Sequence, residues 1–271
     1  MKLTNANYYN KEANQHYFSA SQFKAFHKCE AAALAELNGE YEPERGKALL
    51  LGSYVDEMLT GTRKSQMAFL EANASDLLKK NGEPYADVEQ AMEAVARVKK
   101  QPLMMKYLSG KHQQIMTGEI GGVPFKIKMD SYKPDEFICD LKYMASLRSP
   151  NLFEPMVSYW GYDIQAAIYT EIVRQNTGKQ LPFIFTVVTK EKPARLAVGE
   201  ISRWNVDVAL EKVKKNIARY QAIKNGEIKP QRCEEYDCDY CAATKIITEV
   251  IDTDLFGMSR KQINTMEGTL Q

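Results

Sequence analysis

The chain has 271 residues, with 36 Lys and Arg against 35 Asp and Glu, and 44% of the residues are hydrophobic. This composition excludes a disordered chain, a collagen-like fibre and a protein held to nucleic acid by bulk positive charge, but it is compatible with a local basic groove. The N-terminus has no apolar signal region and no stretch approaches about eighteen uncharged apolar residues, so we expect a cytoplasmic protein without a membrane partner. There, the five cysteines are expected to be thiols or metal ligands.

Apolar periodicity predicts three helices in the N-terminal part of the chain. A capping box at residues 19–22 begins a helix that is expected to end at Gly39. A second helix is expected at about residues 46–60, and a third over the apolar stripe of residues 88–98.

After these helices the hydrophobic period changes from helical to two. Strands are expected at residues 113–120 and 123–130, on either side of a tight turn at Gly121-Gly122, and a third strand at residues 137–142. These three strands predict an antiparallel meander.

The C-terminal half alternates helix and strand patterns. A helix from Trp160 to about Gly178 precedes a buried strand at 183–189, a candidate partner strand at 197–201 and a helix at 206–217.

With no internal repeat or linker, the pattern predicts one α/β (α+β) domain over residues 1–256, with a mixed central sheet that includes the meander and is flanked by helices. Residues 257–271 are expected to form a polar tail.

The chemistry is concentrated at the ends of two predicted neighbouring strands. Alternation places Asp140 and Lys142 on one face of their strand, close to Asp130 at the end of the strand before. Hard cations such as Mg²⁺ bind carboxylate and carbonyl oxygens, so Asp130, Asp140 and the carbonyl of Leu141 are candidate ligands. Lys142 could orient a water molecule or neutralise charge on a phosphate. The alternative is that these acids are only solvated, since Asp-x-Lys is a common tripeptide.

The order of these residues resembles a known superfamily. Asp130, then Asp140-Leu141-Lys142, then a helix with Gln165 and Tyr169 is similar to the PD-(D/E)xK nucleases. Within that superfamily the sequence is most similar to phage and prophage exonucleases of the RecE (exodeoxyribonuclease VIII) and lambda-exonuclease type. The resemblance extends from Tyr17 to the C-terminal cysteines.

The resemblance implies a restriction-endonuclease-like core and a Mg²⁺-dependent or Mn²⁺-dependent enzyme that degrades duplex DNA from its ends in phage-type recombination. It also implies a homo-oligomer and a single-strand annealing protein as partner. By the same resemblance, Asp130 and Asp140 are metal ligands and Lys142 is the catalytic lysine. Gln165 and Tyr169, at i and i+4 on one helix face, support the site or contact the DNA backbone.

Two lysines on the strand of Asp130 are candidate DNA contacts. Alternation places Lys126 and Lys128 on the same face as Asp130, which would direct both ammonium groups toward bound phosphate.

The sequence departs from the family pattern at several positions. The proline and aspartate of the family become Met129-Asp130, and a literal Pro134-Asp135 is set aside because it lies in the predicted turn. Where relatives have Gly-xxx-His, this chain has Gly52 followed four residues later by Asp56. Asp56 is therefore a candidate third metal ligand, the alternative being an exposed helical acid.

An upstream glutamate ligand is also expected from the family pattern. Hairpin pairing about the turn places Glu119 too far from Asp130 and sets Gln113 opposite Asp130. The position of that acid therefore falls to Gln113 or Gln114.

Four of the five cysteines form a second pattern. Cys233, Cys238 and Cys241, together with Cys29, resemble the iron-sulfur ligands of AddB-type and CRISPR-adaptation nucleases, although the C-terminal spacing differs. Zinc or unligated thiols are the alternatives, and Cys139 is expected to be an ordinary buried strand residue.

Three functions remain open from the sequence alone. The leading one is a metal-dependent DNA exonuclease that hydrolyses phosphodiester bonds. The others are an iron-sulfur nuclease acting on single-stranded ends, and a DNA-binding module whose site has become inactive.

Overall fold

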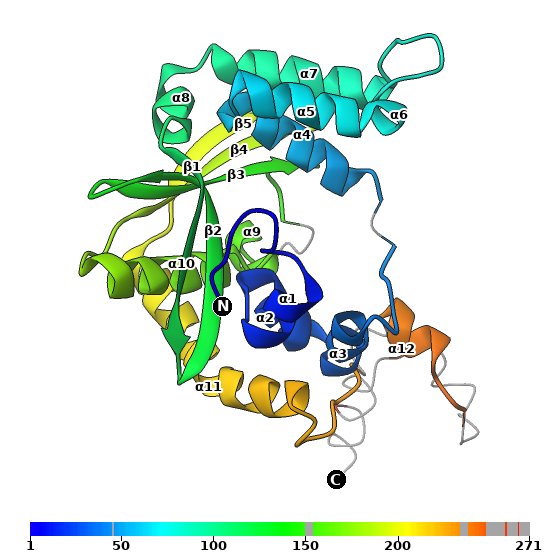
Figure 1. The fold of residues 1–271 in the computed structure, drawn as a ribbon, viewed down its shortest axis with the longest axis vertical. Coiled ribbons are helices and arrows are strands. Elements are labelled where there is room, and N and C mark those ends of the chain that lie inside the picture. The colour runs from blue at the N-terminus through cyan, green and yellow to red at the C-terminus, as the bar shows by residue number, and fades with distance from the viewer. Residues whose placement is uncertain (45, 150–153, 234–237, 248–257, 259–264, 266–271) are drawn as a thin grey trace. The chain divides into compact units, whose positions relative to one another are not determined.

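The chain divides into two compact units. Unit 1 consists of residues 1–20 and 45–215, and unit 2 of residues 21–44 and 216–271. The structure, a computed structural model (Figure 1), describes all residues except 45, 150–153, 234–237, 248–257, 259–264 and 266–271.

Two expectations about the organisation of the chain stay predictions. One is the single nuclease-like domain over residues 1–256. The other, the polar tail at 257–271, lies outside the described residues apart from Met258 and Thr265. Among the helices of the described residues, none has the length and apolar character needed to cross a membrane.

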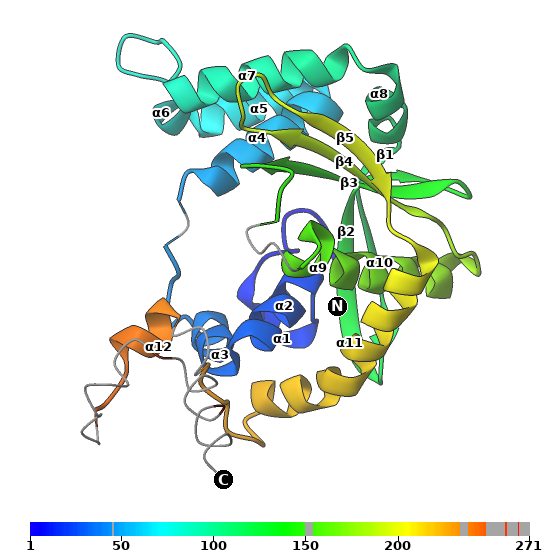
Figure 2. The same ribbon diagram turned by 180° about the vertical axis from the view of Figure 1, so that it is seen from behind.

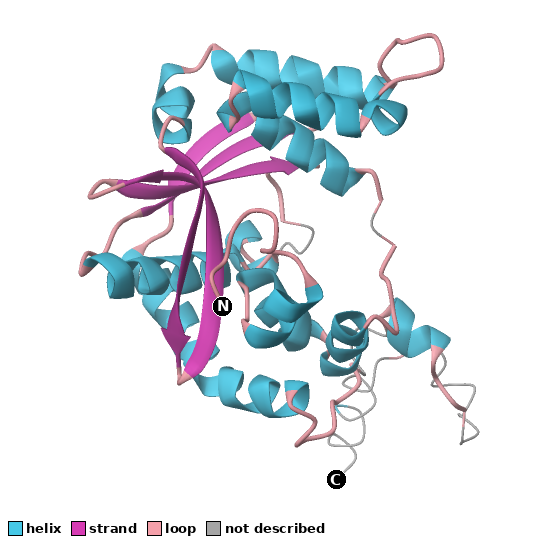
Figure 3. Ribbon diagram, in the orientation of Figure 1, coloured by secondary structure: helices cyan, strands magenta, loops and turns pink. Residues whose placement is uncertain are grey.

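Unit 1 is built on a five-stranded sheet in the order β1-β2-β3-β4-β5, with the strands in magenta in Figure 3. Only the β3–β4 pair is parallel, so the predicted mixed sheet and antiparallel meander are confirmed. The strands are β1 (Lys111–Ile120), β2 (Val123–Lys133), β3 (Phe137–Met144), β4 (Phe183–Thr189) and β5 (Leu196–Glu200).

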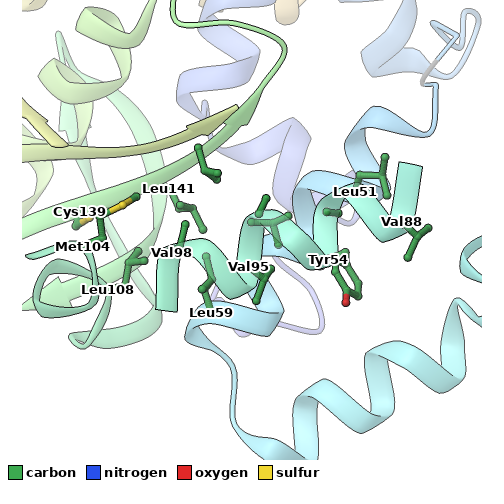
Figure 4. Close-up of a cluster of buried hydrophobic side chains, with 14 of the residues drawn as sticks. Leu51, Tyr54, Leu59, Val88, Val95, Val98, Met104, Leu108, Cys139 and Leu141 are labelled. Carbon is green, nitrogen blue, oxygen red and sulfur yellow. The ribbon is translucent and has the colours of Figure 1, made fainter. Parts of the chain in front are cut away.

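One face of the sheet is covered by helices from the segment between residues 48 and 108. Their buried residues, such as Val98 and Leu59, pack with Cys139 and Leu141 of β3 in a continuous apolar core (Figure 4). Cys139 is thus the buried strand residue that was expected. The helices are α4 (Ala48–Thr60), α5 (Arg63–Ala72), α6 (Ala74–Leu77), α7 (Ala86–Lys99) and α8 (Pro102–Leu108).

The opposite face is covered by α10 (Tyr162–Thr177), seen from behind in Figure 2, which follows the short helix α9 (Met156–Tyr159). Alternation along β4 directs Ile184 to the α4–α8 face and leaves Phe183 in edge contact with Tyr169 of α10. The two faces of β3 divide in the same way. Consequently the polar residues of β3 face α10.

Unit 2 contains α3 (Glu30–Asn38), α12 (Asp239–Ala243), most of α2 (Ala20–Lys28) and the end of α11 (Arg203–Lys224). Phe23 and Phe26 pack against the ring of Tyr220. The Glu30 carboxylate accepts two hydrogen bonds from Arg219, at 2.7 and 2.8 Å.

The single helix expected between residues 19 and 39 is wrong, because the chain leaves helical geometry at Cys29, where φ is −158° and ψ is 110°. Cys29 is the N-cap of α3, and its Sγ accepts a hydrogen bond from the Ala32 N–H at 3.5 Å. The Ala31 N–H donates to the carbonyl of Gln231 instead of continuing α2. A contact between segments two hundred residues apart is invisible to helical periodicity.

Gly110 allows the close approach of the chain before β1 to the backbone of β2. A Cβ at this position would lie 2.7 Å from the carbonyl carbon and oxygen of Tyr132, whose position is set by the β1–β2 register. We expect Gly110→Ala to lower the free energy of unfolding in urea by about 1–3 kcal/mol. Gly199→Ala in β5 is the matched control, since its Cβ meets no atom within 4 Å. Equal losses in the two variants would contradict this role for Gly110.

Candidate active site

The candidate site lies at a fork between β2 and β3. The ladder between these strands runs from Lys133 and Phe137 to Ser131 and Cys139 and then stops. Asp130 and Asp140 occupy the next position on each strand, where the paired strands separate. The predicted convergence of the two acids is therefore a consequence of register.

The Asp130 side chain accepts a hydrogen bond from a backbone N–H of β3 that has no partner in the β2–β3 ladder. Its Oδ2 accepts a hydrogen bond from the Leu141 N–H at 3.0 Å, and its carbonyl oxygen lies 2.7 Å from His112 Nδ1. Burial raises the pKa of the Asp130 carboxyl well above its ordinary value, and the negative charges of Asp140 and Asp56 raise it further. The site thus holds this acid in an environment that disfavours its charged form.

Asp140, Lys142 and Gln165 form a closed polar triangle between β3 and α10. Lys142 Nζ lies 2.6 Å from Asp140 Oδ2 and donates to Gln165 Oε1 at 3.1 Å. Gln165 Nε2 donates to Asp140 Oδ1 at 2.5 Å, so both ends of the amide are used. Burial alone would lower the pKa of Lys142, but the charges of Asp140 and Asp130 outweigh it and the pKa is raised. Lys142 is therefore held as an ammonium group.

Asp56 joins this cluster from α4. Its Oδ2 accepts a hydrogen bond from Gln113 Nε2 at 3.0 Å, and its Oδ1 accepts one from Thr60 Oγ1 at 3.1 Å. Burial raises the pKa of Asp56; His112 and the Thr60 hydrogen bond lower it, and the charge of Asp140 raises it. Asp56 is therefore a half-buried acid of the cluster rather than an exposed helical one.

Gln113 occupies the position that the hairpin register gave it. Its neighbours His112 and Gln114 pair with Ser131 and Met129, which leaves Gln113 opposite Asp130. Its φ of 51° is unusual for a residue other than glycine, and its amide holds Asp56. Gln114, the other candidate, instead donates to the carbonyl of Ile115 at 3.2 Å.

The donor set fits a divalent cation of the Mg²⁺ type. Three carboxylates, those of Asp56, Asp130 and Asp140, interact electrostatically, and the ammonium group of Lys142 offsets part of their negative charge. Asp140 is buried, and its Oδ2 lies 2.6 Å from the Lys142 ammonium group. Hard oxygen donors with uncompensated negative charge are what Mg²⁺ and Mn²⁺ bind.

Tyr169 of α10 contacts the backbone of β2. Its hydroxyl donates to the carbonyl of Lys128 at 3.0 Å, and its ring is buried. Burial raises the pKa of this phenol well above its ordinary value, and nearby tyrosines and acids raise it further by smaller amounts. This contact favours the supporting role among the two that the sequence left open.

The N-terminal segment supplies residues that the sequence analysis missed. Phe18 forms a β-bridge with Phe125 of β2. This places the N-terminal segment alongside the part of β2 that does not pair with β3. There the rings of Tyr9 and Tyr8 lie 4.3 and 5.2 Å from Lys128 Nζ, measured to the ring centroids. The adjacent tyrosines were a visible signal, but their partner strand was not.

His112 was also missed, since the three histidines show no ligand spacing. Its Nε2 lies 3.2 Å from Thr60 Oγ1, so the imidazole links α4 to the backbone of Asp130. The hairpin register carried a signal for it, because it places His112 opposite Ser131, next to Asp130.

Lys126 is buried, which contradicts the prediction that it contacts DNA. Its ammonium group donates to the carbonyl of Tyr8 and, at 2.7 Å, to Asn14 Oδ1, and 1% of the residue is exposed. Burial, and then the charge of Lys128, lower the pKa of Lys126 to about 8. Alternation gave the correct face of β2 but not the segment that covers it.

The four cysteines that the sequence analysis grouped also lie close together in the structure, within unit 2. The sulfur atoms of Cys29, Cys233, Cys238 and Cys241 all lie within 4.8 Å of one another. The fifth cysteine, Cys139, belongs to the core of unit 1.

Comparisons with known proteins agree with this fold. Residues 19–244 match the family described as PDDEXK-like domain of unknown function (DUF3799). A crystal structure from Eubacterium rectale, described as a "putative exonuclease", is 40% identical to this chain, with a TM-score of 0.86, and the match covers 95% of this chain and 99% of that one. No curated protein matches. The chain belongs to this PDDEXK-like family, which confirms the PD-(D/E)xK resemblance and the restriction-endonuclease-like fold.

The burial of Lys126 leads to a stability prediction. We expect Lys126→Met to lower the free energy of unfolding by about 1–3 kcal/mol, because the Tyr8 carbonyl and Asn14 lose a charged donor. Lys128→Met, on the same strand face, is the control and should change it by less than about 0.5 kcal/mol.

The pH dependence of this difference has a defined sign. The pKa of Lys126 is about 8 in the folded chain against an ordinary 10.5, so between these values the unfolded chain binds more protons. The wild type should therefore gain stability relative to Lys126→Met as the pH rises from about 8 to 10. Urea denaturation at each pH measures the difference in free energy of unfolding between the wild type and Lys126→Met. A difference that stays constant or falls as the pH rises would argue against a buried ammonium group.

Proposed function

We propose that this chain is a metal-dependent DNA exonuclease that hydrolyses phosphodiester bonds at DNA ends. One observation carries the proposal: at the β2–β3 fork the Asp140 carboxylate pairs with Lys142, and the carboxylates of Asp130 and Asp56 interact electrostatically with Asp140. Membership of the PDDEXK-like family and the 40% identity to a protein described as a "putative exonuclease" support it.

The residues that would hold Mg²⁺ or Mn²⁺ are Asp130 and Asp140, with the carbonyl of Leu141 and the Asp56 carboxylate as further donors. When bound, such an ion supplies Lewis-acid activation of water and of the phosphate. The chain itself positions the ion's ligands, because Asp130 is fixed by the Leu141 N–H and Asp140 by Gln165.

Lys142 supplies the positive charge of the protein at the reacting phosphate. Its raised pKa keeps it protonated, so in this proposal it stabilises negative charge that develops on phosphate oxygens rather than acting as a base. Gln165 is a positioning residue, since its amide holds Lys142 and Asp140 at once. Tyr162 flanks the ammonium, with its ring centroid 5.0 Å from Lys142 Nζ.

The DNA contact that this arrangement favours is the surface of Lys128 and Tyr9, whose ring is 69% exposed. A lysine can bind a backbone phosphate, and the exposed aromatic ring beside it can stack against an unpaired base near a strand end. Lys126 is left out of this surface because it is buried.

The preference for duplex ends, the part in phage-type recombination, the annealing partner, the homo-oligomer and the cytoplasmic location are supported by the sequence alone. They form part of the proposal on that footing. An inactive DNA-binding module is the second candidate, favoured by the replacement of the upstream glutamate by Gln113.

Substitution of the lysine at the fork tests the catalytic proposal. We expect Lys142→Ala to slow degradation of linear duplex DNA, with Mg²⁺ or Mn²⁺, by at least about 100-fold, because a charge aimed at the phosphate is lost. Lys179→Ala is the matched control: it also removes a lysine from an ion pair, with Asp135 at 2.8 Å, but on the exposed surface. Equal activity of the wild type and Lys142→Ala would exclude the assignment. DNA binding without cleavage under any divalent ion would select the inactive module.

Repulsion within the acidic cluster predicts that neutralising Asp56 raises the melting temperature without divalent ions but reduces the stabilisation that Mg²⁺ provides. Without divalent ions, Asp56→Asn should raise the melting temperature, since one of three mutually repelling carboxylates is neutralised. With millimolar Mg²⁺, the same variant should gain less stability than the wild type, because a ligand is weakened. Asp76→Asn, on the short surface helix α6, is the control. A Mg²⁺-induced shift that Asp56→Asn leaves intact would remove Asp56 from the ligand set.

A further inference from the structure

The four-cysteine cluster of unit 2 is assembled from three separate segments. Cys29 begins α3, Cys233 lies after α11, and Cys238 and Cys241 belong to the start of α12 and its interior. All four sulfur atoms lie within 4.8 Å of one another. Cys29 and Cys241 are buried and the other two are partly buried. Such convergence of thiols from distant segments needs a cause beyond apolar packing.

The sulfur spacing distinguishes between possible occupants. A disulfide requires about 2.05 Å between sulfur atoms, whereas the Cys29 and Cys241 sulfurs lie 3.5 Å apart. Four thiolates at about 2.3 Å from one tetrahedral ion lie about 3.8 Å from one another, which is the scale observed. In a [4Fe–4S] cluster the four irons are corners of the cube and each thiolate binds a different iron, so the ligand sulfurs lie farther apart than they do around a single ion.

The surrounding hydrogen bonds suit thiolates. The backbone N–H of Ala32 donates to Cys29 Sγ at 3.5 Å, and that of Cys238 donates to Cys233 Sγ at 3.4 Å. Arg232 holds the backbone at Cys241 by donating to its carbonyl at 2.6 Å. Amide donors to ligand sulfur and fixed ligand backbones are the outer interactions that metal sites use.

We propose that Cys29, Cys233, Cys238 and Cys241 bind a single tetrahedral metal ion, with zinc as the expected ion, in a closed structural site. Four protein ligands leave no position for substrate, in contrast with a catalytic zinc site. The ion would link α3 to α12 within unit 2. The break in the helix at Cys29 places its sulfur at the N-cap of α3, within 4.8 Å of the other three sulfur atoms.

Metal analysis of the intact chain tests the proposal without any activity assay. Protein purified anaerobically and desalted without a chelator should contain about one zinc per chain and show no visible absorption. Chain grown with cobalt in place of zinc should show the intense visible bands of a tetrahedral tetrathiolate. Iron with acid-labile sulfide and a brown colour would overturn the single-ion proposal in favour of a cluster.

Cysteine variants provide the matched comparison. Cys241→Ser should lose the zinc and the cobalt bands, whereas Cys139→Ser, which removes the one cysteine outside the cluster, should retain both. If Cys241→Ser fails to fold, Cys233→Ser at a partly buried position gives the same readout. A wild type with five titratable thiols and no metal, or loss of metal in Cys139→Ser alone, would overturn the proposal.

Discussion

Electrostatic repulsion among three carboxylates is the constraint on which the rest of the site depends. Asp56, Asp130 and Asp140 are brought together by α4, β2 and β3, and burial together with their mutual repulsion raises the pKa of Asp130 and of Asp56. One ammonium group, Lys142, offsets part of this charge at 2.6 Å from Asp140. The remainder is an electrostatic cost that the fold sustains, and a divalent cation is the species that would relieve it.

The uncharged residues of the site follow from this constraint. Gln165 and Gln113 are amides, and each donates a hydrogen bond to a carboxylate of the cluster without adding charge. A fourth acid at Gln113 would increase the repulsion, and its replacement by an amide turns a potential ligand into a support for Asp56. The apolar core between β3 and the α4–α8 helices resists the repulsion, because it fixes the strand and the helix that present Asp140 and Asp56.

Much of this arrangement could be predicted from the sequence because it depends on local rules. Alternation and the Gly121-Gly122 turn determined the register of the hairpin, and that register sets Gln113 opposite Asp130 and separates Glu119 from it. What could not be predicted depends on contacts between distant segments. The break at Cys29 accompanies the hydrogen bond from the Ala31 N–H to the Gln231 carbonyl. Lys126 is buried because its ammonium group donates to the Tyr8 carbonyl and to Asn14. Strand periodicity assigns a side chain to a face but does not say which segment covers that face.

We propose that the acids at the β2–β3 fork bind a divalent cation. The most direct measurement is anomalous diffraction from crystals of the chain soaked in Mn²⁺. We expect an anomalous peak in contact with carboxylate oxygens of Asp130 and Asp140. Well-ordered carboxylates at the fork with no manganese peak between them, at millimolar Mn²⁺, would contradict this proposal.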